Sequence, residues 1–259
     1  MSVDEVTALF QGICAYTDAV FARAGTLRLL LAAIALAVSA VQPVSAHASS
    51  PTTVADGQSP EPRSEMRLDG SVFRLLVPFR TQKDGGRWQT SNCGPATLGM
   101  ILDGFGLTDH ATDDLRVRAH TYQGTLGMRT GTGLDHVAHV GEDLGVGTHG
   151  LFGPDGAFRR WGTSEILAEL RQGRPVMPLV RLYLVPGYEG MAPRWGHYIL
   201  LTGIGPDGYF FSDSLKTDAG AGTSGVIPER QLMSAMDASH IPGQAVAFSG
   251  PRPLPVWQP

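Results

Sequence analysis

Cysteine, long apolar runs and clustered positive charge are all scarce in this chain. Cys14 and Cys93 are the two thiols among 259 residues. The apolar run at residues 29–38 has about half of the roughly 20 residues that a membrane-spanning helix needs. The 20 Lys and Arg residues are scattered among 24 acidic ones, giving a formal net charge of −4 without a dense basic stripe. This distribution argues against nucleic acid as a partner and gives no support to membrane-surface binding.

The N-terminus has the layout of a secretory signal. Arginines precede the apolar run, and a small-residue site at residues 44–46 follows it. We therefore expect residues 1–46 to be removed, leaving an exported protein, secreted or held in the cell envelope, with no integral membrane domain. Cys93 is then the single thiol of the mature chain, which excludes an internal disulfide. An unpaired cysteine in an oxidising compartment indicates a functional role.

The remainder of the chain divides into a linker and one domain. Residues 47–65 are rich in Ser, Pro and Thr, as linkers are, and we assign residues 66–259 to one folded domain. Apolar spacing and turn residues predict helices at 93–102, 134–144, 163–170 and 228–236 and strands at 72–79, 175–185, 199–204, 209–212 and 245–248. Most helices precede most strands. This order predicts an α+β domain in which a helical part packs on an antiparallel sheet.

Cys93 stands at the predicted start of a helix, within Ser91-Asn92-Cys93-Gly94-Pro95. Either Asn92 or Ser91 is predicted to cap this helix. The unpaired N–H groups and the dipole at a helix N-terminus favour a thiolate, which is the form in which cysteine attacks. The backbone N–H of Cys93 would also provide one donor of an oxyanion hole. The sequence therefore favours a nucleophile over a small buried hydrophobic residue.

A base and a carboxylate occur on a predicted hairpin. His197 begins an apolar strand, and Asp213 ends the strand that returns across the turn at residues 205–208. With the turn centred there, His197 and Asp213 fall almost opposite each other, within reach for the carboxylate to accept the imidazole N–H. Cys93, His197 and Asp213 thus satisfy the requirements for a nucleophile, a base and a group that orients the base.

These motifs resemble those of the bacteriocin-processing, double-glycine peptidase family and its exported relatives. The resemblance covers roughly residues 76–236 and is carried by the run 92–96 with Met100 after it, by Gly196-His197-Tyr198 with residues 201–203 after it, and by the strand end at Asp213. It implies a papain-like fold, a peptide or protein substrate, no cofactor, and catalytic roles for Cys93, His197 and Asp213. We expect the enzyme to be a monomer.

A glutamine side chain usually completes the oxyanion hole of papain-like enzymes. Gln82 and Gln89 both precede the cysteine, and we favour Gln82, which follows the first predicted strand. Two departures from the family pattern concern this region. The family's glutamine usually lies nearer to the cysteine than Gln82 does, and Ser214 follows Asp213 where proline is common.

Other functions are compatible with the same residues. An amidase or a transglutaminase-like acyltransferase would use the same triad, and a binding module of this fold would leave Cys93 inert. The segment 183–194, which precedes the histidine, is a candidate wall of the substrate cleft. His136 and His139 lie three residues apart on a predicted helix, but no nearby cluster completes a zinc pattern, so we expect no metal.

Overall fold

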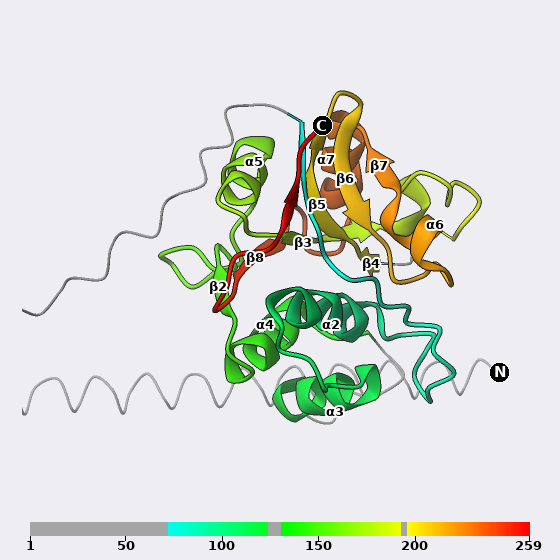
Figure 1. Cartoon of the computed structure of the whole chain (residues 1–259), viewed down its shortest axis with the longest axis vertical. Coiled ribbons are helices and arrows are strands. Elements are labelled where there is room, and N and C mark those ends of the chain that lie inside the picture. Colours follow the sequence, from blue (N-terminus) through cyan, green and yellow to red (C-terminus); the bar gives the residue numbers. More distant parts are fainter. Residues whose placement is uncertain (1–71, 124–130, 193–195) are drawn as a thin grey trace, which may run out of the picture. The chain divides into compact units, whose positions relative to one another are not determined.

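The computed structural model describes residues 72–123, 131–192 and 196–259 (Figure 1). The predicted signal at 1–46 and the linker at 47–65 lie outside these ranges, as does the predicted start of the domain near Met66. Among the described residues, no helix combines the length and the hydropathy that crossing a bilayer requires.

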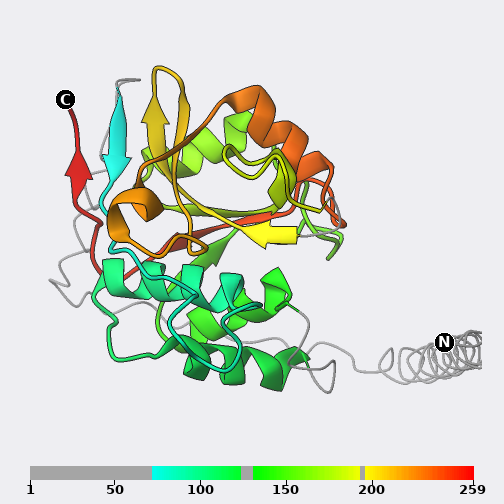
Figure 2. The same cartoon turned by 90° about the vertical axis from the view of Figure 1, so that its right-hand side faces the viewer.

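Three helices of the first half of the domain pack together. They are α2 (Cys93–Phe105), α3 (Thr112–Gln123) and α4 (Leu134–Asp143). Helices α2 and α4 were predicted, whereas α3 was not, because its polar sequence buries little beyond Leu115, Arg116 and Ala119. Figure 2 shows the three helices gathered on one side of the sheet.

An antiparallel sheet forms the second part of the domain. Its strands are β1 (Phe73–Leu75), β2 (Gly147–His149), β3 (Val176–Arg181), β4 (Gly196–Tyr198), β5 (Leu200–Gly205), β6 (Gly208–Ser212), β7 (Gly225–Ile227), β8 (Ala245–Ser249) and β9 (Val256–Trp257). The main order is β2-β8-β3-β5-β1-β9, while β4 pairs with β3, and β6 pairs with β5 and β7. The predicted α+β class, with helices packed on an antiparallel sheet, is therefore confirmed.

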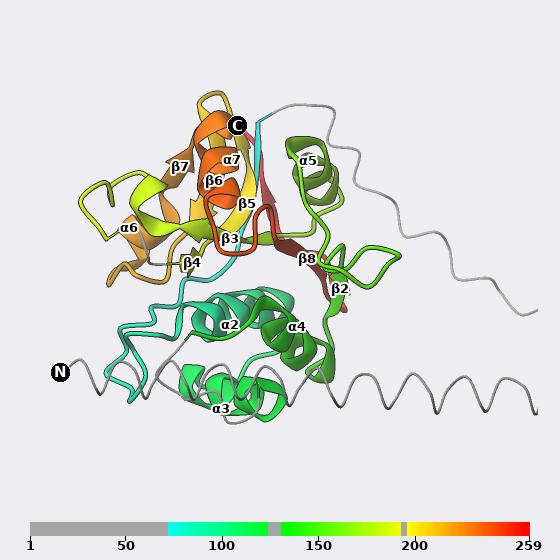
Figure 3. The same ribbon diagram turned by 180° about the vertical axis from the view of Figure 1, so that it is seen from behind.

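The opposite side of the sheet carries further helices. These are α5 (Thr163–Arg171) and α7 (Glu229–Asp237), with the short helices η1 (Leu182–Leu184) and α6 (Ala219–Thr223) nearby. Seen from behind, α5 and α7 flank β3 and β5 on the side away from α2 and α4 (Figure 3). Strand β3 is covered on both faces, which explains its uninterrupted run of buried residues from Val176 to Val180.

Several predicted strands have different limits in the structure. Strand β1 ends at Leu75, well before Phe79, and Pro78 within the remaining segment has no N–H for a ladder. The strand predicted at 175–185 ends at Arg181, where η1 begins. The strand predicted at 245–248 is present as β8, which lies between β2 and β3 inside the sheet.

The predicted hairpin of β5 and β6 is present, with Gly205 paired to Gly208. The ladder ends with Leu200 opposite Ser212, and β4 turns away to pair with β3, where His197 lies opposite Val180. His197 and Asp213 therefore do not face each other as cross-strand neighbours. They meet because Asp213 directly follows the end of β6 and its side chain reaches back toward β4.

Candidate active site

Cys93 is the first residue of α2 and is partly buried. The predicted cap is wrong in its detail, because Asn92 occupies the cap position without a side-chain hydrogen bond to the helix. Instead, Asn92 Nδ2 donates to Asp113 Oδ1 of α3 at 2.8 Å, and Arg116 Nη1 donates to the Ser91 carbonyl at 2.9 Å. Helix α3 thereby fixes the turn that precedes Cys93. Because the Asn92 side chain does not cap α2, the N-terminus of α2 is free to interact with the Cys93 thiol.

His197 is 3% exposed and lies between the cysteine and an aspartate. Its Nε2–H donates to Asp213 Oδ1 at 2.8 Å. The Cys93 thiol is the second group that interacts with the imidazole, through hydrogen bonding and charge. Burial by itself lowers the pKa of His197, but the hydrogen bonds and charges of Asp213 and Cys93 outweigh it and raise that pKa to about 9.

The Cys93 thiol is shifted in the complementary direction. Burial by itself raises its pKa, but the hydrogen bond and positive charge of His197 lower it, helped by the backbone N–H groups of Tyr198 and Gly94. The result is a pKa below the ordinary value. A lowered thiol pKa beside a raised imidazole pKa favours a thiolate–imidazolium pair, which is the reactive form of a nucleophilic cysteine.

Asp213 is held by several donors and is 1% exposed. The Leu215 N–H donates to its Oδ1 at 2.9 Å, and the Tyr188 hydroxyl donates to its Oδ2 at 2.5 Å. Burial raises the pKa of this carboxyl, yet the hydrogen bond and charge of His197, together with those two donors, bring it below the ordinary value. Asp213 therefore stays ionised and fixes the orientation of the imidazole.

Gln82, the preferred oxyanion candidate, is 2% exposed and lies beside the Asp213 loop. Its backbone N–H donates to the Ser214 carbonyl at 2.8 Å, and its side-chain Nε2 donates to the Gln89 carbonyl at 2.9 Å. The Ser214 hydroxyl donates to Gln82 Oε1 at 3.1 Å. Because both ends of the amide have partners, its orientation is fixed and one N–H of Nε2 is left over. Gln89 contributes a backbone carbonyl to this arrangement.

Two residues beside the site, Tyr188 and Ser214, were not predicted as functional from the sequence. Tyr188 lies in the segment 183–194 and contacts Asp213, and the Lys216 ammonium lies 4.4 Å from the centre of the Tyr188 ring. In the sequence, Ser214 is marked only by its departure from the family pattern, in which proline is common at this position. Neither residue has a sequence signal of its own, since their roles depend on which segments fold next to Asp213.

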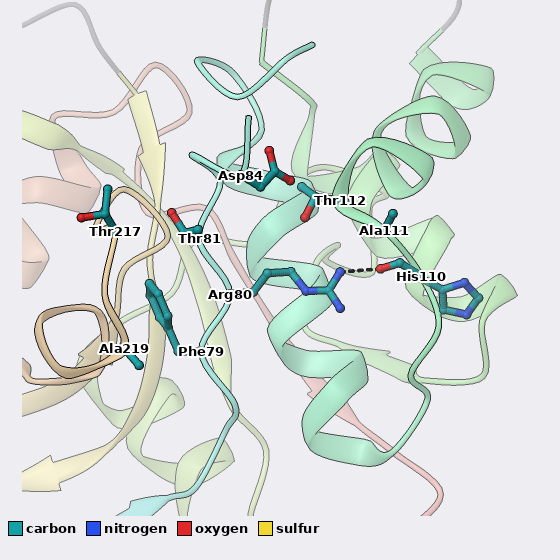
Figure 4. Close-up of a pocket in the computed structure, with 9 residues that line it drawn as sticks. All are labelled: Phe79, Arg80, Thr81, Asp84, His110, Ala111, Thr112, Thr217 and Ala219. Atoms are coloured by element: carbon teal, nitrogen blue, oxygen red, sulfur yellow. Dashed lines mark hydrogen bonds between the residues drawn. The ribbon is translucent and has the colours of Figure 1, made fainter. Parts of the chain in front are cut away.

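An open depression of about 500 Å³ lies next to the segment that leads to Gln82 (Figure 4). Figure 4 shows the Arg80 side chain reaching across it to the His110 carbonyl, to which its Nη1 donates. Arg80 also makes a bidentate pair with Asp103 of α2, with Nη2 2.7 Å from Oδ2. The Arg80 guanidinium thus joins the segment before Gln82 to α2 and to the loop that precedes α3.

Metal ligands do not gather in the described part of the chain. No group of three or more His, Cys, Asp or Glu side chains with metal-binding geometry occurs there. His136 contacts the Asp135 carboxylate at 3.6 Å, and His139 Nδ1 contacts the Asp135 carbonyl oxygen at 2.7 Å.

Comparison with known proteins returned solved structures alone. No family model matches the chain, and no curated protein matches it. A protein from Bacillus anthracis assigned to the C39-like peptidases has 16% identity and a TM-score of 0.48, over 68% of this chain and 97% of that one.

Two further solved structures cover the same 68% of this chain. A double-glycine-motif protease from an AMS/PCAT transporter, in complex with the leader peptide, has 16% identity, a TM-score of 0.43 and 92% of its own length covered. The peptidase domain of Streptococcus ComA, a bifunctional ABC transporter, has 14% identity, a TM-score of 0.43 and 98% covered. These are the peptidase types that the sequence motifs resemble. Their TM-scores lie below 0.5, so the function rests on the geometry of the site itself.

Proposed function

We propose that this chain is an exported cysteine peptidase that hydrolyses peptide bonds through Cys93, His197 and Asp213. One observation carries the proposal: a buried imidazole hydrogen-bonds to a carboxylate at 2.8 Å and also interacts with a thiol at the N-terminus of a helix. This is the arrangement that acyl transfer by a cysteine nucleophile requires. Export is proposed from the signal-like N-terminus alone.

The chemistry follows from the pairing of charges. The Cys93 thiolate attacks the carbonyl carbon of the scissile bond, and the carbonyl oxygen becomes an oxyanion that accepts hydrogen bonds from the Cys93 backbone N–H and the Gln82 amide. His197 then gives its proton to the leaving amine, which departs and leaves a thioester on Cys93. A water molecule, deprotonated by His197, attacks the thioester and releases the second product with regeneration of the thiolate. Asp213 stabilises the imidazolium throughout.

Turnover of a peptide library tests the proposal. A Cys14→Ser background in the full chain leaves Cys93 as the sole thiol, so its alkylation by iodoacetamide can be followed without interference. We expect the background protein to cleave peptides and to be alkylated rapidly at pH 7. Cys93→Ala should reduce turnover at least ~1,000-fold, because the nucleophile is lost, and His197→Ala should slow alkylation.

Exposed residues provide the matched control. Ser234→Ala alters an exposed residue of α7, whose hydroxyl bonds the Arg230 carbonyl, and should leave both readouts unchanged. Equal turnover by the background protein and its Cys93→Ala derivative would disprove the assignment. Transfer of an acyl group to an added amine without net hydrolysis would identify the rival acyltransferase. A thiol of ordinary reactivity with no turnover would indicate a binding module.

A further inference from the structure

A second cavity, of about 390 Å³, lies directly beside the candidate active site. Thr132 and Tyr198 form part of its wall. A Cβ atom placed on Gly94, the neighbour of the cysteine, would lie 2.5 Å from Thr132 Oγ1 and 3.4 Å from Tyr198 Cδ2. Tyr198 follows the base His197, and its backbone N–H hydrogen-bonds to the Cys93 sulfur. The cavity therefore shares its wall with the groups that would attack the scissile bond.

Two buried polar atoms of this wall have no partner within the protein. They are Gln244 Nε2, on a side chain 1% exposed, and Thr132 Oγ1, on a side chain 4% exposed. Buried donors are almost always satisfied in folded proteins, since an unmet one costs free energy. An amide N–H needs an acceptor, and a hydroxyl takes either role. Together they fit a ligand that brings a carbonyl oxygen into the cavity.

The charge of the lining restricts that ligand further. Asp135 is the carboxylate of the wall, and none of the described lining residues is a lysine or arginine. His240, the histidine of the lining, has its pKa lowered by burial and then by the nearby Arg181, so it is neutral at neutral pH. An anionic side chain would meet Asp135 without a compensating cation. A cationic side chain would leave the Gln244 N–H unpaired.

We propose that this cavity is the specificity subsite of the peptidase and binds the neutral amide side chain of a glutamine or asparagine close to the scissile bond. The proposal rests on the proposed peptidase function. The amide oxygen of the substrate accepts from Gln244 Nε2, and its NH₂ group donates toward Thr132 Oγ1 or Asp135. The methylenes pack against Phe158 and Ile241, which also line the cavity.

Matched substrates provide the test. Starting from a peptide that is cleaved, each position near the cleaved bond is occupied in turn by Gln, Glu or Met, which have similar length but differ in hydrogen bonding and charge. At one position we expect kcat/KM for Gln to exceed that for Met and for Glu by about 10-fold or more, as for a site built around a hydrogen bond. Cleavage with no position favouring Gln would overturn the subsite while leaving the peptidase intact.

Substitutions in the cavity wall test which residues cause the preference for Gln over Met. Gln244→Met keeps the length of the side chain and removes its amide, so the Gln-to-Met ratio should fall to about 1. Gln172→Met, an exposed substitution at the end of α5, is the matched control and should retain the ratio. If Gln244→Met does not fold, Thr132→Val serves in its place and should reduce the ratio. A Gln preference that survives in whichever variant folds would overturn the proposal.

Peptide-binding measurements test the subsite independently of peptide-bond cleavage. The same peptide pairs, labelled with a fluorophore, are titrated with the Cys93→Ala protein and followed by anisotropy. Tighter binding of the Gln peptide than of the Met peptide supports the subsite even if no peptide is cleaved. Equal affinities, or no binding of either peptide, overturn it.

Discussion

At the scale of single residues, Ser214 contacts Gln82, the candidate oxyanion donor. Ser214 lies far from Cys93 in the sequence, so its position along the chain does not suggest a role. Its hydroxyl donates to Gln82 Oε1 at 3.1 Å, and both side chains are buried. The amide has a second anchor in the Gln89 carbonyl. Two anchors on one planar group fix its rotation, which keeps the remaining Nε2 proton in one direction. Ser214 is thus a positioning residue.

Ser214→Ala tests this positioning. The substitution removes the donor to Oε1 and frees the amide to rotate, so transition-state stabilisation should weaken while substrate binding is kept. We expect kcat to fall about 10-fold with little change in KM, less than the ~100-fold loss for Gln82→Ala that follows removal of an oxyanion donor. Steady-state kinetics on one cleaved peptide would measure both.

Ser234→Ala is the matched control, since its hydroxyl bonds the Arg230 carbonyl on the exposed face of α7. It should have wild-type kinetics. A normal kcat in Ser214→Ala together with a strong defect in Gln82→Ala would contradict the positioning role, and a rise in KM with unchanged kcat would do the same.

Residue chemistry indicated Cys93, His197 and Asp213, because each belongs to a motif or a strand end that can be seen in the sequence, and Gln82 followed from the glutamine that papain-like enzymes usually use. Tyr188 and Ser214 could not be found in this way. The Tyr188 hydroxyl reaches Asp213 from a segment 25 residues earlier, and Ser214 reaches Gln82 across 132 residues. Contacts of this kind depend on tertiary packing, about which local spacing says nothing.

At the scale of elements, α3 and the segment before Gln82 fasten the start of α2. Helix α3 supplies Asp113 and Arg116 to the turn that carries Cys93. Arg80 joins the segment to Asp103 on α2 and to the His110 carbonyl before α3. Helix α3 was not predicted from the sequence, because its few buried apolar residues give no strong periodic pattern. Its stability therefore comes from these polar contacts and from packing on α2.

Arg80→Met tests how strongly these elements are joined. Methionine retains apolar bulk but removes the bidentate pair, leaving the mostly buried Asp103 carboxylate without its partner. We expect the free energy of unfolding in urea to fall by about 1–3 kcal/mol. The exposed Arg230→Met on α7 should change it by less than about 0.5 kcal/mol. Equal effects of the two substitutions would show that the Arg80 contacts add nothing beyond an ordinary surface charge.

At the scale of the whole domain, the antiparallel sheet and the helical part meet at the site. Cys93 comes from the helical part, and His197 and Asp213 come from the sheet. The class of this architecture could be predicted, since helical and strand periodicities are segregated along the chain. The sheet order could not, because β8 inserts between β2 and β3 although it comes late in the sequence. Short strands such as β2, β7 and β9 are set by their partners rather than by a pattern of their own.

The buried pair of His197 and Asp213 also links the stability of the domain to pH. His197 has a pKa of about 9 against an ordinary 6.5, so its stabilisation is complete below pH 6.5 and is lost as the pH rises through 9. Asp213 has a lowered pKa, so its stabilisation is present above its ordinary 3.8 and is lost as the pH falls through the folded value. Both contributions are complete together between about pH 4 and pH 6.5.

Asp213→Asn should therefore lower the melting temperature most within that window. Removing the charge leaves a buried imidazole that no longer gains from protonation, which we expect to cost about 2–3 kcal/mol, or roughly 5–10 °C. The difference in melting temperature between wild type and Asp213→Asn should shrink above pH 9, measured by circular dichroism across pH 4–10. Asp207→Asn, in the turn between β5 and β6, is the control and should show no such window. A difference that is constant with pH would mean that the pair does not gain its stability from ionisation.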